Sequence, residues 1–443
     1  MREMKDSGIE WIGEIPVHWE TRKLKYIFAD GEDGLKIGPF GSAIRGKTLD
    51  MGPYKIYNQA HLIQNDFSLN RHFISEETFS ELKGYEVKPG DILFSMMGTI
   101  GKCQIMPEGY QQGIMDSHLL KSGLKKDIHP RFLVYAYDKD YSDQVIAQLI
   151  YASNGTIMNG LNSTILKSVV IAYPPREEQE KIVHYLDSKC SKIDEIITKQ
   201  KQIIEKLKEY KLSLITEAVT KGLNPDVEMK ESGIKYVESI PCDWENRKMI
   251  SILSMRVVDG PHESPELFDS GIPYISATSI VDGRIDFSLK RGYISEEYCD
   301  ICDKRYIPRI GDILVVKLGA STGQVAIVDT NERFNIWVPL AAVRCGDEAL
   351  PQYVYYAFQS DYFIRQMELS WTYGTQQTLG VQTIERLRIL LPPFKEQEQI
   401  AIFLDEKCKA LDEVLIKKKK LILKLQEYKK SLIYEVVTGK KEV

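Results

Sequence analysis

Residues 41–48, Gly-Ser-Ala-Ile-Arg-Gly-Lys-Thr, match the phosphate-loop pattern of nucleotide-binding enzymes. That chemistry requires a buried strand before the loop and a helix whose N-terminus faces the phosphates. No apolar strand precedes the motif, and residues 49–53, Leu-Asp-Met-Gly-Pro, cannot sustain such a helix. We therefore expect a glycine-rich basic surface loop, in which Lys36, Arg45 and Lys47 meet the phosphates of a nucleic-acid backbone. Nucleotide hydrolysis is an alternative that rests on this motif alone.

Cysteines, histidines and carboxylates are present, but not in catalytic or metal-binding patterns. Cys299 and Cys302 form a lone CxxC pair, whereas a structural zinc needs four ligands. Cys345 and His262 would be arbitrary completions of such a site. No Ser/His/Asp order or spaced pair of carboxylates stands out, and both Pro-Pro pairs lack the preceding Asn or Asp of an adenine-methylating motif. The sequence predicts a chain without catalytic apparatus and without a bound metal.

Polar side chains gather beside glycines in several turns of the chain. The segments 58–61, Asn-Gln-Ala-His, and 375–378, Thr-Gln-Gln-Thr, are two examples. Asn and Gln can bond bidentately to an adenine edge, and Ser or Thr can bond to any base. Ordinary turn chemistry accounts for such clusters as well. The clusters are therefore candidates for base contacts, with a purely structural role as the alternative.

The sequence segments that would position these side chains occur twice in the chain. Residues 4–23 return as residues 229–248, with Ser-Gly-Ile, Ile-Pro, Trp-Glu and Arg-Lys in the same order. Residues 174–220 match residues 392–438 at 26 of 47 positions without a gap. Between these segments the copies diverge. The pattern indicates two tandem copies of one unit, each with a variable body and a near-constant tail.

Apolar residues in both tails alternate at three- and four-residue spacing, which is typical of a coiled coil. Pro-Pro pairs precede the tails, and Gly222 and Gly439 follow them, so each tail has helix start and stop signals. The shared seam favours packing of the two helices against each other over two separate surface helices. The seam residues are Ile193, Ile197, Ile204, Leu207 and Leu214 in the first tail, and Leu411, Leu415, Ile422, Leu425 and Leu432 in the second.

The bodies contain short β-branched and aromatic runs, for example at 54–57, 92–95 and 313–316, interrupted by helix-like stretches near 131–149 and 351–368. We predict a mixed α/β (α+β) fold with two globular domains separated by two long antiparallel coiled-coil helices, a pseudo-twofold tandem repeat. An antiparallel pair would suit a DNA duplex, whose strands are themselves antiparallel. The predicted limits are 1–173 for the first domain, 174–222 for the first helix, 223–391 for the second domain and 392–443 for the second helix.

Composition excludes several classes of protein. A hydrophobic share of 43% is enough for real cores, so wholesale disorder is excluded. No apolar run approaches the roughly 18 residues of a membrane helix, and the first residues do not form a signal peptide. Seven scattered cysteines indicate reduced thiols in a cytoplasm. A net charge of −5 argues against a protein that holds DNA by itself.

The order of these motifs, given twice, resembles the specificity (S) subunit of type I restriction–modification enzymes over essentially the whole chain. The openings at 5–20 and 230–245, the segment 38–42 (Gly-Pro-Phe-Gly-Ser) and the segment 259–262 (Asp-Gly-Pro-His) carry the resemblance. The repeated Gly-Asp-Ile-Leu segments and the Pro-Pro…Glu-Gln-Glu helix starts add to it.

The resemblance implies two target-recognition domains, each of which reads one half of a bipartite, asymmetric sequence in double-stranded DNA. It implies helices that set the unread gap and two methyltransferase (M) subunits, which use S-adenosylmethionine, docked on this chain. It further implies nuclease-translocase (R) subunits that use ATP and Mg. The chain itself would be non-catalytic and would bind no cofactor. We expect the helix seam to take part in docking the M subunits.

On this basis we expect DNA contacts from polar and basic side chains of both bodies. The candidates are Lys36, Ser42, Arg45, Lys47, Asn58, Gln59, His61, Thr99, Lys102, Asn154 and Thr156 in the first body, and His262, Ser276, Thr278, Lys317, Ser321, Thr322, Thr375, Gln376 and Gln377 in the second. Residues 223–391 carry a net charge of −7, so we expect the M subunits to supply much of the clamp on DNA. The alternatives are a non-catalytic coiled-coil scaffold, a degenerate specificity subunit and an autonomous transcription factor.

Overall fold

The computed structural model describes residues 2–70, 72–97, 99–138, 140–152, 161–373 and 377–443. The chain divides into two compact units. Unit 1 comprises residues 1–200 and 420–443, and unit 2 comprises residues 201–419. Each of the two long helices therefore contributes one half to each unit.

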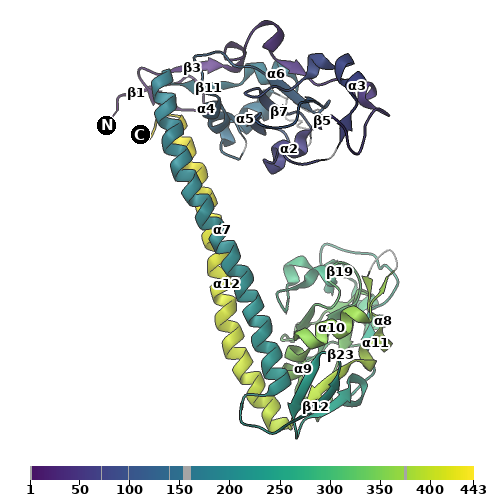
Figure 1. The fold of residues 1–443 in the computed structure, drawn as a ribbon. Coiled ribbons are helices and arrows are strands. Elements are labelled where there is room, and N and C mark those ends of the chain that lie inside the picture. The colour runs from purple at the N-terminus through teal and green to yellow at the C-terminus, as the bar shows by residue number, and fades with distance from the viewer. Residues whose placement is uncertain (1, 71, 98, 139, 153–160, 374–376) are drawn as a thin grey trace. The chain divides into compact units, whose positions relative to one another are not determined.

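Unit 1 combines a body of short strands and short helices with one half of each long helix (Figure 1). Its strands are β1 (Met4–Asp6), β2 (Glu14–Pro16), β3 (Glu20–Lys23), β4 (Lys36–Ile37), β5 (Tyr54–Tyr57), β6 (Phe73–Ile74), β7 (Ile92–Ser95), β8 (Cys103–Ile105), β9 (Gly113–Met115), β10 (Leu119–Ser122) and β11 (Val170–Tyr173). Its helices are α1 (Gly41–Ile44), α2 (Gln59–Gln64), α3 (Glu76–Glu81), α4 (Pro130–Tyr137), α5 (Asp143–Ala152), α6 (Ser163–Ser168) and the first half of α7 (Arg176–Lys221).

Unit 2 repeats this plan. Its strands are β12 (Met229–Ile234), β13 (Val237–Pro241), β14 (Glu245–Lys248), β15 (Val258–Asp259), β16 (Ile272–Ile275), β17 (Ile280–Val281), β18 (Arg284–Ile285), β19 (Gly292–Ile294), β20 (Ile313–Val316), β21 (Val325–Ile327), β22 (Asn335–Ile336), β23 (Leu340–Val343), β24 (Thr372–Tyr373), β25 (Gln377–Thr378) and β26 (Arg388–Leu391). Its helices are α8 (Glu296–Asp303), α9 (Pro351–Phe358), α10 (Asp361–Leu369), α11 (Val381–Arg386) and the first half of α12 (Phe394–Val437).

The sheets of the two units share one topology. Unit 1 has a four-stranded sheet in the order β4-β10-β7-β8 and a three-stranded sheet in the order β6-β5-β9, in which β5 and β9 run parallel. In unit 2 the same orders return as β15-β23-β20-β21 and β19-β16-β22, and β16 and β22 run parallel. The inner strands β7 and β20 are buried along their full length, as their continuous apolar sequences require. The repeat in the sequence thus encodes a repeated fold.

A buried tryptophan joins each body to the start of its long helix. Trp19 Nε1 donates to Glu178 Oε2 at 3.1 Å, and Trp244 Nε1 donates to Glu396 Oε2 at 3.0 Å. Both indoles are essentially inaccessible. The next residue of each helix is a buried glutamine, whose side chain accepts a backbone N–H of the body. The Glu-Gln-Glu motif that marks both helix starts is therefore the attachment between body and helix.

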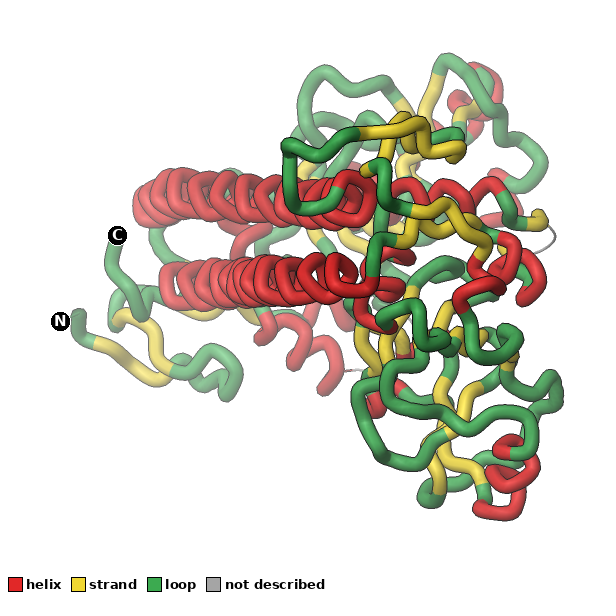
Figure 2. Tube along the Cα trace, turned by 90° about the horizontal axis from the view of Figure 1, so that it is seen from below, coloured by secondary structure: helices red, strands yellow, loops and turns green. Residues whose placement is uncertain are grey.

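The long helices start directly after the two Pro-Pro pairs, at Arg176 and Phe394, and end at Lys221 and Val437. Glycines with positive φ stand just beyond both ends, Gly222 at +76° and Gly439 at +72°. At Gly439 a side chain would also collide with the body, because a Cβ there would lie 2.4 Å from Cδ of Pro16. Within each unit, one half of α7 lies beside one half of α12 (Figures 1 and 2).

The predicted seam is buried or half-buried throughout. Ile193, Ile197, Ile204, Leu415 and Leu432 are buried, and Leu207, Leu214, Leu411, Ile422 and Leu425 are half-buried. Ile193 and Ile197 share a core with Leu432 in unit 1, with Ile422 and Leu425 packed against it. The coiled-coil spacing predicted from the sequence is confirmed.

Ion pairs between the helices fix their antiparallel register. In unit 1, Lys429 Nζ lies 2.7 Å from Asp194 Oδ2, and in unit 2, Lys211 Nζ lies 2.7 Å from Asp412 Oδ1. The two pairs are related by the 218-residue offset that relates the two helices, so they are copies of one contact. Lys211 and Lys429 thus each have an ion-pair partner in the opposite helix.

Two predicted helices are each divided into two. The stretch 131–149 forms α4 and α5, and the stretch 351–368 forms α9 and α10. Asp138 ends α4, where its carboxylate accepts the backbone N–H of Cys103 at 2.9 Å, and Ser360 stands between α9 and α10. Among the residues that the structure describes, no helix has both the length and the apolar character that crossing a membrane would take.

Candidate nucleic-acid interface

The loop with the phosphate-loop pattern lies on the surface of unit 1. Its short helix α1 precedes Gly46 and Lys47 instead of following them, so no helix N-terminus faces a phosphate there. Lys47 Nζ pairs with Glu81 at 2.6 Å, and Lys36 Nζ donates to the carbonyl oxygen of Gly84 at 2.8 Å. The geometry required for nucleotide hydrolysis is absent from this described segment. The loop is exposed as predicted, while contact of its basic residues with phosphates stays a prediction.

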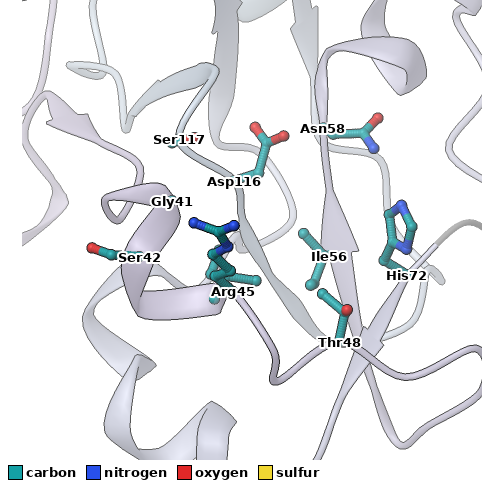
Figure 3. Close-up of a pocket in the computed structure, with 10 residues that line it drawn as sticks. Gly41, Ser42, Arg45, Thr48, Ile56, Asn58, His72, Asp116 and Ser117 are labelled. Carbon is teal, nitrogen blue, oxygen red and sulfur yellow. The ribbon is translucent and has the colours of Figure 1, made fainter.

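A pocket of about 580 Å³ opens beside this loop (Figure 3). It lies among α1, β5 and the turn after β9. Its described lining residues are Gly41, Ser42, Ile44, Arg45, Thr48, Ile56, Asn58, His72, Asp116 and Ser117. The candidates Ser42, Arg45 and Asn58 are thereby brought together in one site. Arg45 is exposed, and its guanidinium has no hydrogen-bond or ion-pair partner among the residues described.

Asn58 is held in place by the start of α2. Asn58 is the N-cap residue of that helix, and its side-chain Oδ1 accepts the backbone N–H of Ala60 at 3.0 Å. The neighbouring candidate Gln59 is half-buried at the first position of the helix, and Thr99 is half-buried in the turn before β8. Only Asn58 of these three lines the pocket.

Two candidate lysines belong to the cores of the domains. Lys102 is buried and pairs with Asp138 and Asp140, whose charges raise the pKa of Lys102 although burial alone lowers it. Lys317 is buried and its Nζ lies 2.7 Å from Asp259 Oδ2. A buried lysine cannot leave its carboxylate without a large cost in free energy. The structure thus places both lysines in buried ion pairs, and their contact with DNA stays an untested prediction.

Three further candidates are also buried and engaged in the fold. His61 is fully buried, with Nδ1 close to Asn58 and Nε2 3.1 Å from the carbonyl oxygen of Leu69. Ser276 is the N-cap of a short helical turn, and the Thr322 hydroxyl donates to the carbonyl oxygen of Gly319 at 2.7 Å. For these three the structural alternative of turn and cap chemistry accounts for the placement of the residue, and their contact with DNA stays an untested prediction.

The remaining candidates of unit 2 are accessible. His262 and Thr278 are exposed, and Ser321 and Gln377 are half-buried. His262 lies 3.4 Å from Asp259, so it stands at the edge of the same ion-pair cluster as Lys317. The candidates Asn154, Thr156, Thr375 and Gln376 lie outside the described residues.

The cysteines of the CxxC pair are part of the core of unit 2. Cys299 and Cys302 are both buried in or at the end of α8, and burial raises the pKa of the Cys299 thiol to about 11. Across the described ranges no cluster of three or more His, Cys, Asp and Glu side chains is placed to hold a metal ion.

The structure adds functional candidates that the sequence did not reveal. In unit 1 these are His72 and the consecutive residues Asp116 and Ser117, which reach the pocket from two different parts of the chain. In unit 2, Arg291 stacks over Trp337, with Cζ 3.2 Å from the ring centroid. Within the described residues neither Arg291 Nη1 nor Trp337 Nε1 has a hydrogen-bond partner. The sequence feature that could have indicated these residues is the Gly-Pro pair at 38 and at 260. Gly38 packs against the backbone of Asp116, and Gly260 packs against the backbone of Trp337.

Two copies of one body with polar loops, attached to a shared pair of long helices, define a two-domain recognition protein. The sequence profile of the family described as "Type I restriction modification DNA specificity domain" matches residues 16–209 and 241–438. The chain belongs to this family, that of the type I restriction–modification specificity subunits, and carries the domain twice. Members of the family are non-catalytic specificity subunits.

Individual relatives agree with this assignment. The chain is 26% identical over 439 residues to a putative type I restriction enzyme MjaX specificity subunit of Methanocaldococcus jannaschii, covering 97% of this chain and 95% of that protein. It is 24% identical to the type I restriction enzyme EcoBI specificity subunit of Escherichia coli, covering 72% of this chain and 66% of that protein. Its fold resembles a chain solved in a structural study of complex assembly and conformational transition of the type I R-M system, with a TM-score of 0.66, 14% identity and coverage of 96% and 99%.

Proposed function

We propose that this chain reads a bipartite, asymmetric target in double-stranded DNA, one half with each recognition domain. The observation that carries the proposal is the tandem match to a DNA specificity domain on two bodies of the same topology. The bodies share their sheets and differ in the side chains of their loops. A shared scaffold with different loops suits two different half-sites, because base readout depends on the few side chains that reach the base edges.

The two long helices set the length of the unread DNA between the half-sites and dock two M subunits. Each helix carries exposed apolar residues at heptad spacing outside its seam. These docking stripes consist of Ile196, Ile203 and Tyr210 on α7, and of Val414, Leu421 and Tyr428 on α12. The stripes are related by the same 218-residue offset as the helices themselves. Two equivalent apolar stripes suit two copies of one partner that packs helix against helix.

The chemistry of the complex resides in the partner subunits. The M subunits bring S-adenosylmethionine and methylate adenine, and R subunits bring ATP and Mg for cleavage in the cytoplasm, where the cell's DNA lies. This division agrees with the acidic balance of residues 223–391, whose net charge of −7 gives weak binding through phosphate contacts alone. The M subunits then supply much of the positive clamp, and this chain supplies base readout.

A selection from random duplexes tests the proposal. The chain is assembled with its M subunits, incubated with a library of random double-stranded DNA, and the retained duplexes are sequenced. We expect two specified blocks separated by unspecified base pairs of fixed number, with weaker retention when the M subunits are omitted. A single continuous block, or retention without sequence preference, would contradict two independent readers and would favour a scaffold or a degenerate subunit.

A further inference from the structure

The turn after the parallel strand of the three-stranded sheet occupies the same place in both domains. In unit 1 this turn begins with Asp116, whose backbone N–H donates to the carbonyl oxygen of Tyr57 at 2.8 Å. In unit 2 it begins with Trp337, whose backbone N–H donates to the carbonyl oxygen of Ile275 at 2.9 Å. The backbone is therefore held identically, while one domain presents a carboxylate and the other an indole.

A glycine fixes this turn in each domain. A Cβ on Gly38 would lie 1.7 Å from the carbonyl oxygen of Asp116, and a Cβ on Gly260 would lie 2.2 Å from that of Ile336. No other residue fits at such distances, so the neighbouring loop packs directly against the turn. The side chains at 116 and 337 consequently start from a rigid backbone, which is what base discrimination requires.

Asp116 offers an acceptor to the pocket of unit 1. Its Oδ1 accepts the backbone N–H of His118 at 2.9 Å, and Oδ2 lies 3.2 Å from Nδ1 of the same residue. The Asp116 side chain keeps an exposed fraction of 19%. An ionised carboxylate has about four acceptor positions and no donor, so these two contacts leave capacity for a further donor.

Asn58 lines the same pocket and carries a donor (Figure 3). Its Oδ1 is taken by the N-terminus of α2, which orients the amide group. No hydrogen bond of the described residues uses Nδ2, so the amide N–H groups remain available for a ligand. Arg45 adds a cation on the loop that borders the pocket, where a DNA phosphate would neutralise it.

One acceptor and one donor in a shared pocket complement the major-groove edge of adenine. Adenine presents an N6 amino donor and an N7 acceptor, whereas guanine presents two acceptors, cytosine one amino donor and thymine one acceptor with a methyl group. We propose that Asp116 and Asn58 read an adenine in the half-site of the first domain, with Asp116 accepting from N6 and Asn58 Nδ2 donating to N7. This inference rests on the proposed function, because it presupposes that the first domain reads one half-site.

The second domain reads its half-site by other contacts. Trp337 replaces the carboxylate, and Arg291 lies across its ring. Neither group is an acceptor, since indole and guanidinium N–H groups only donate. The same backbone position thus carries an acceptor in the first domain and an indole with a buried Nε1 in the second, so the two domains do not make the same contact at this position.

Substitutions that keep the helix cap separate readout from folding. Asn58→Ser and Asn58→Asp both retain a good N-cap residue. Asn58→Ser removes the amide donor, whereas Asn58→Asp places an acceptor against adenine N7. Asp116→Asn keeps the shape of the side chain but adds a donor that faces the N6 amino group. Glu108→Gln, at an exposed position outside the pocket, is the matched control.

The readout is the pattern of methylated sites in the genome of cells that express the full chain with its M subunits. Co-purification with M subunits shows which variants fold. At one A·T pair of one half-site, we expect the preference for adenine over the other bases to fall about 5- to 150-fold in each pocket variant. The fall should be largest for Asn58→Asp. The other half-site should stay unchanged in every variant, and Glu108→Gln should match the wild type.

The possible results separate this inference from the proposed function. Assembled pocket variants that keep the wild-type motif would overturn the assignment, and so would a change confined to a G·C pair. An equal loss of both half-sites would show a general binding role instead of base readout, which also overturns it. If Asn58→Asp fails to assemble, Asn58→Ser and Asp116→Asn decide. A wild-type complex that methylates no split motif would refute the proposed function itself, and this inference with it.

Discussion

Glu178 and Glu396 occupy equivalent positions and accept equivalent tryptophan N–H groups, yet their pKa values shift in opposite directions. Burial alone raises the pKa of both. At Glu178, hydrogen bonds from His18, Trp19 and Arg2 lower it below its ordinary value. At Glu396 burial raises the pKa, the bond from Trp244 only partly offsets it, and the charge of Asp243 raises it further. The second copy has Asp243 at the position where the first has His18, so one contact is electrostatically favourable and the other is not.

The two glutamates therefore predict opposite responses to Glu→Gln substitution. A lowered pKa means that Glu178 stabilises the fold above the unfolded-state pKa, and that this contribution is lost as pH falls through the folded-state pKa. A raised pKa means that the contribution of Glu396 is present below the unfolded-state pKa and is lost as pH rises through the folded-state pKa. At pH 7 we expect Glu178→Gln to lower the free energy of unfolding by about 1 kcal/mol, and Glu396→Gln to leave it unchanged or raise it. Urea titrations of both variants at pH 7 check this, and equal losses would contradict it.

Placement of single residues was the least predictable feature of the site. Lys102 and Lys317 stand next to glycine-containing turns, which are usually exposed. Both are nevertheless buried, and they form ion pairs with Asp138 and Asp259, which lie far away in the sequence. The pocket could not be predicted from spacing either. Its polar residues come from separate segments around 41–48, 58, 72 and 116–117. The pairing of β5 with β9 and with β6, and the bridge between Leu49 and Phe73, bring these segments together.

The long helices were the most predictable elements, because the spacing of their apolar seam residues is a local sequence pattern that occurs in both tails. What the pattern could not provide is the antiparallel register, which depends on the pairing of Lys211 with Asp412 and of Lys429 with Asp194. Nor did it separate seam from surface function. The seam is expected to take part in M-subunit docking; its residues pack against the opposite helix, and the stripes that we propose for docking are exposed outside it.

The stripes give a prediction at the scale of these elements. Tyr210 and Tyr428 are 57% and 55% exposed, so Tyr210→Glu and Tyr428→Glu should leave the melting temperature of the chain unchanged. We expect each to weaken M-subunit binding roughly tenfold or more, as loss of a buried aromatic contact does at interfaces. Lys201→Glu, at an exposed position of α7 outside the stripe, serves as the control. Unaltered M-subunit binding by the double variant, measured by titration calorimetry, would place the docking surface elsewhere.

At the scale of the whole molecule, the proposed function requires two domains that read DNA independently on one pair of helices. The division of the chain into two compact units supports this, because each unit contains a complete body with its own tryptophan attachment and its own core. The repeat, the fold class and the family were all accessible from the sequence, since they rest on motif order. The identity of the recognised bases was not, since it rests on a few loop side chains.

The measurement that tests this account most directly is genome-wide adenine methylation in cells that express the chain with its M subunits. It is made for the natural chain and for a chain in which residues 246–391 are exchanged for those of another specificity subunit. We predict a split, asymmetric motif in which the exchange replaces one half and leaves the other half and the spacer length unchanged. A motif in which the exchange alters both halves, or no methylation by a complex that assembles fully, would contradict two independent readers on a fixed helical spacer.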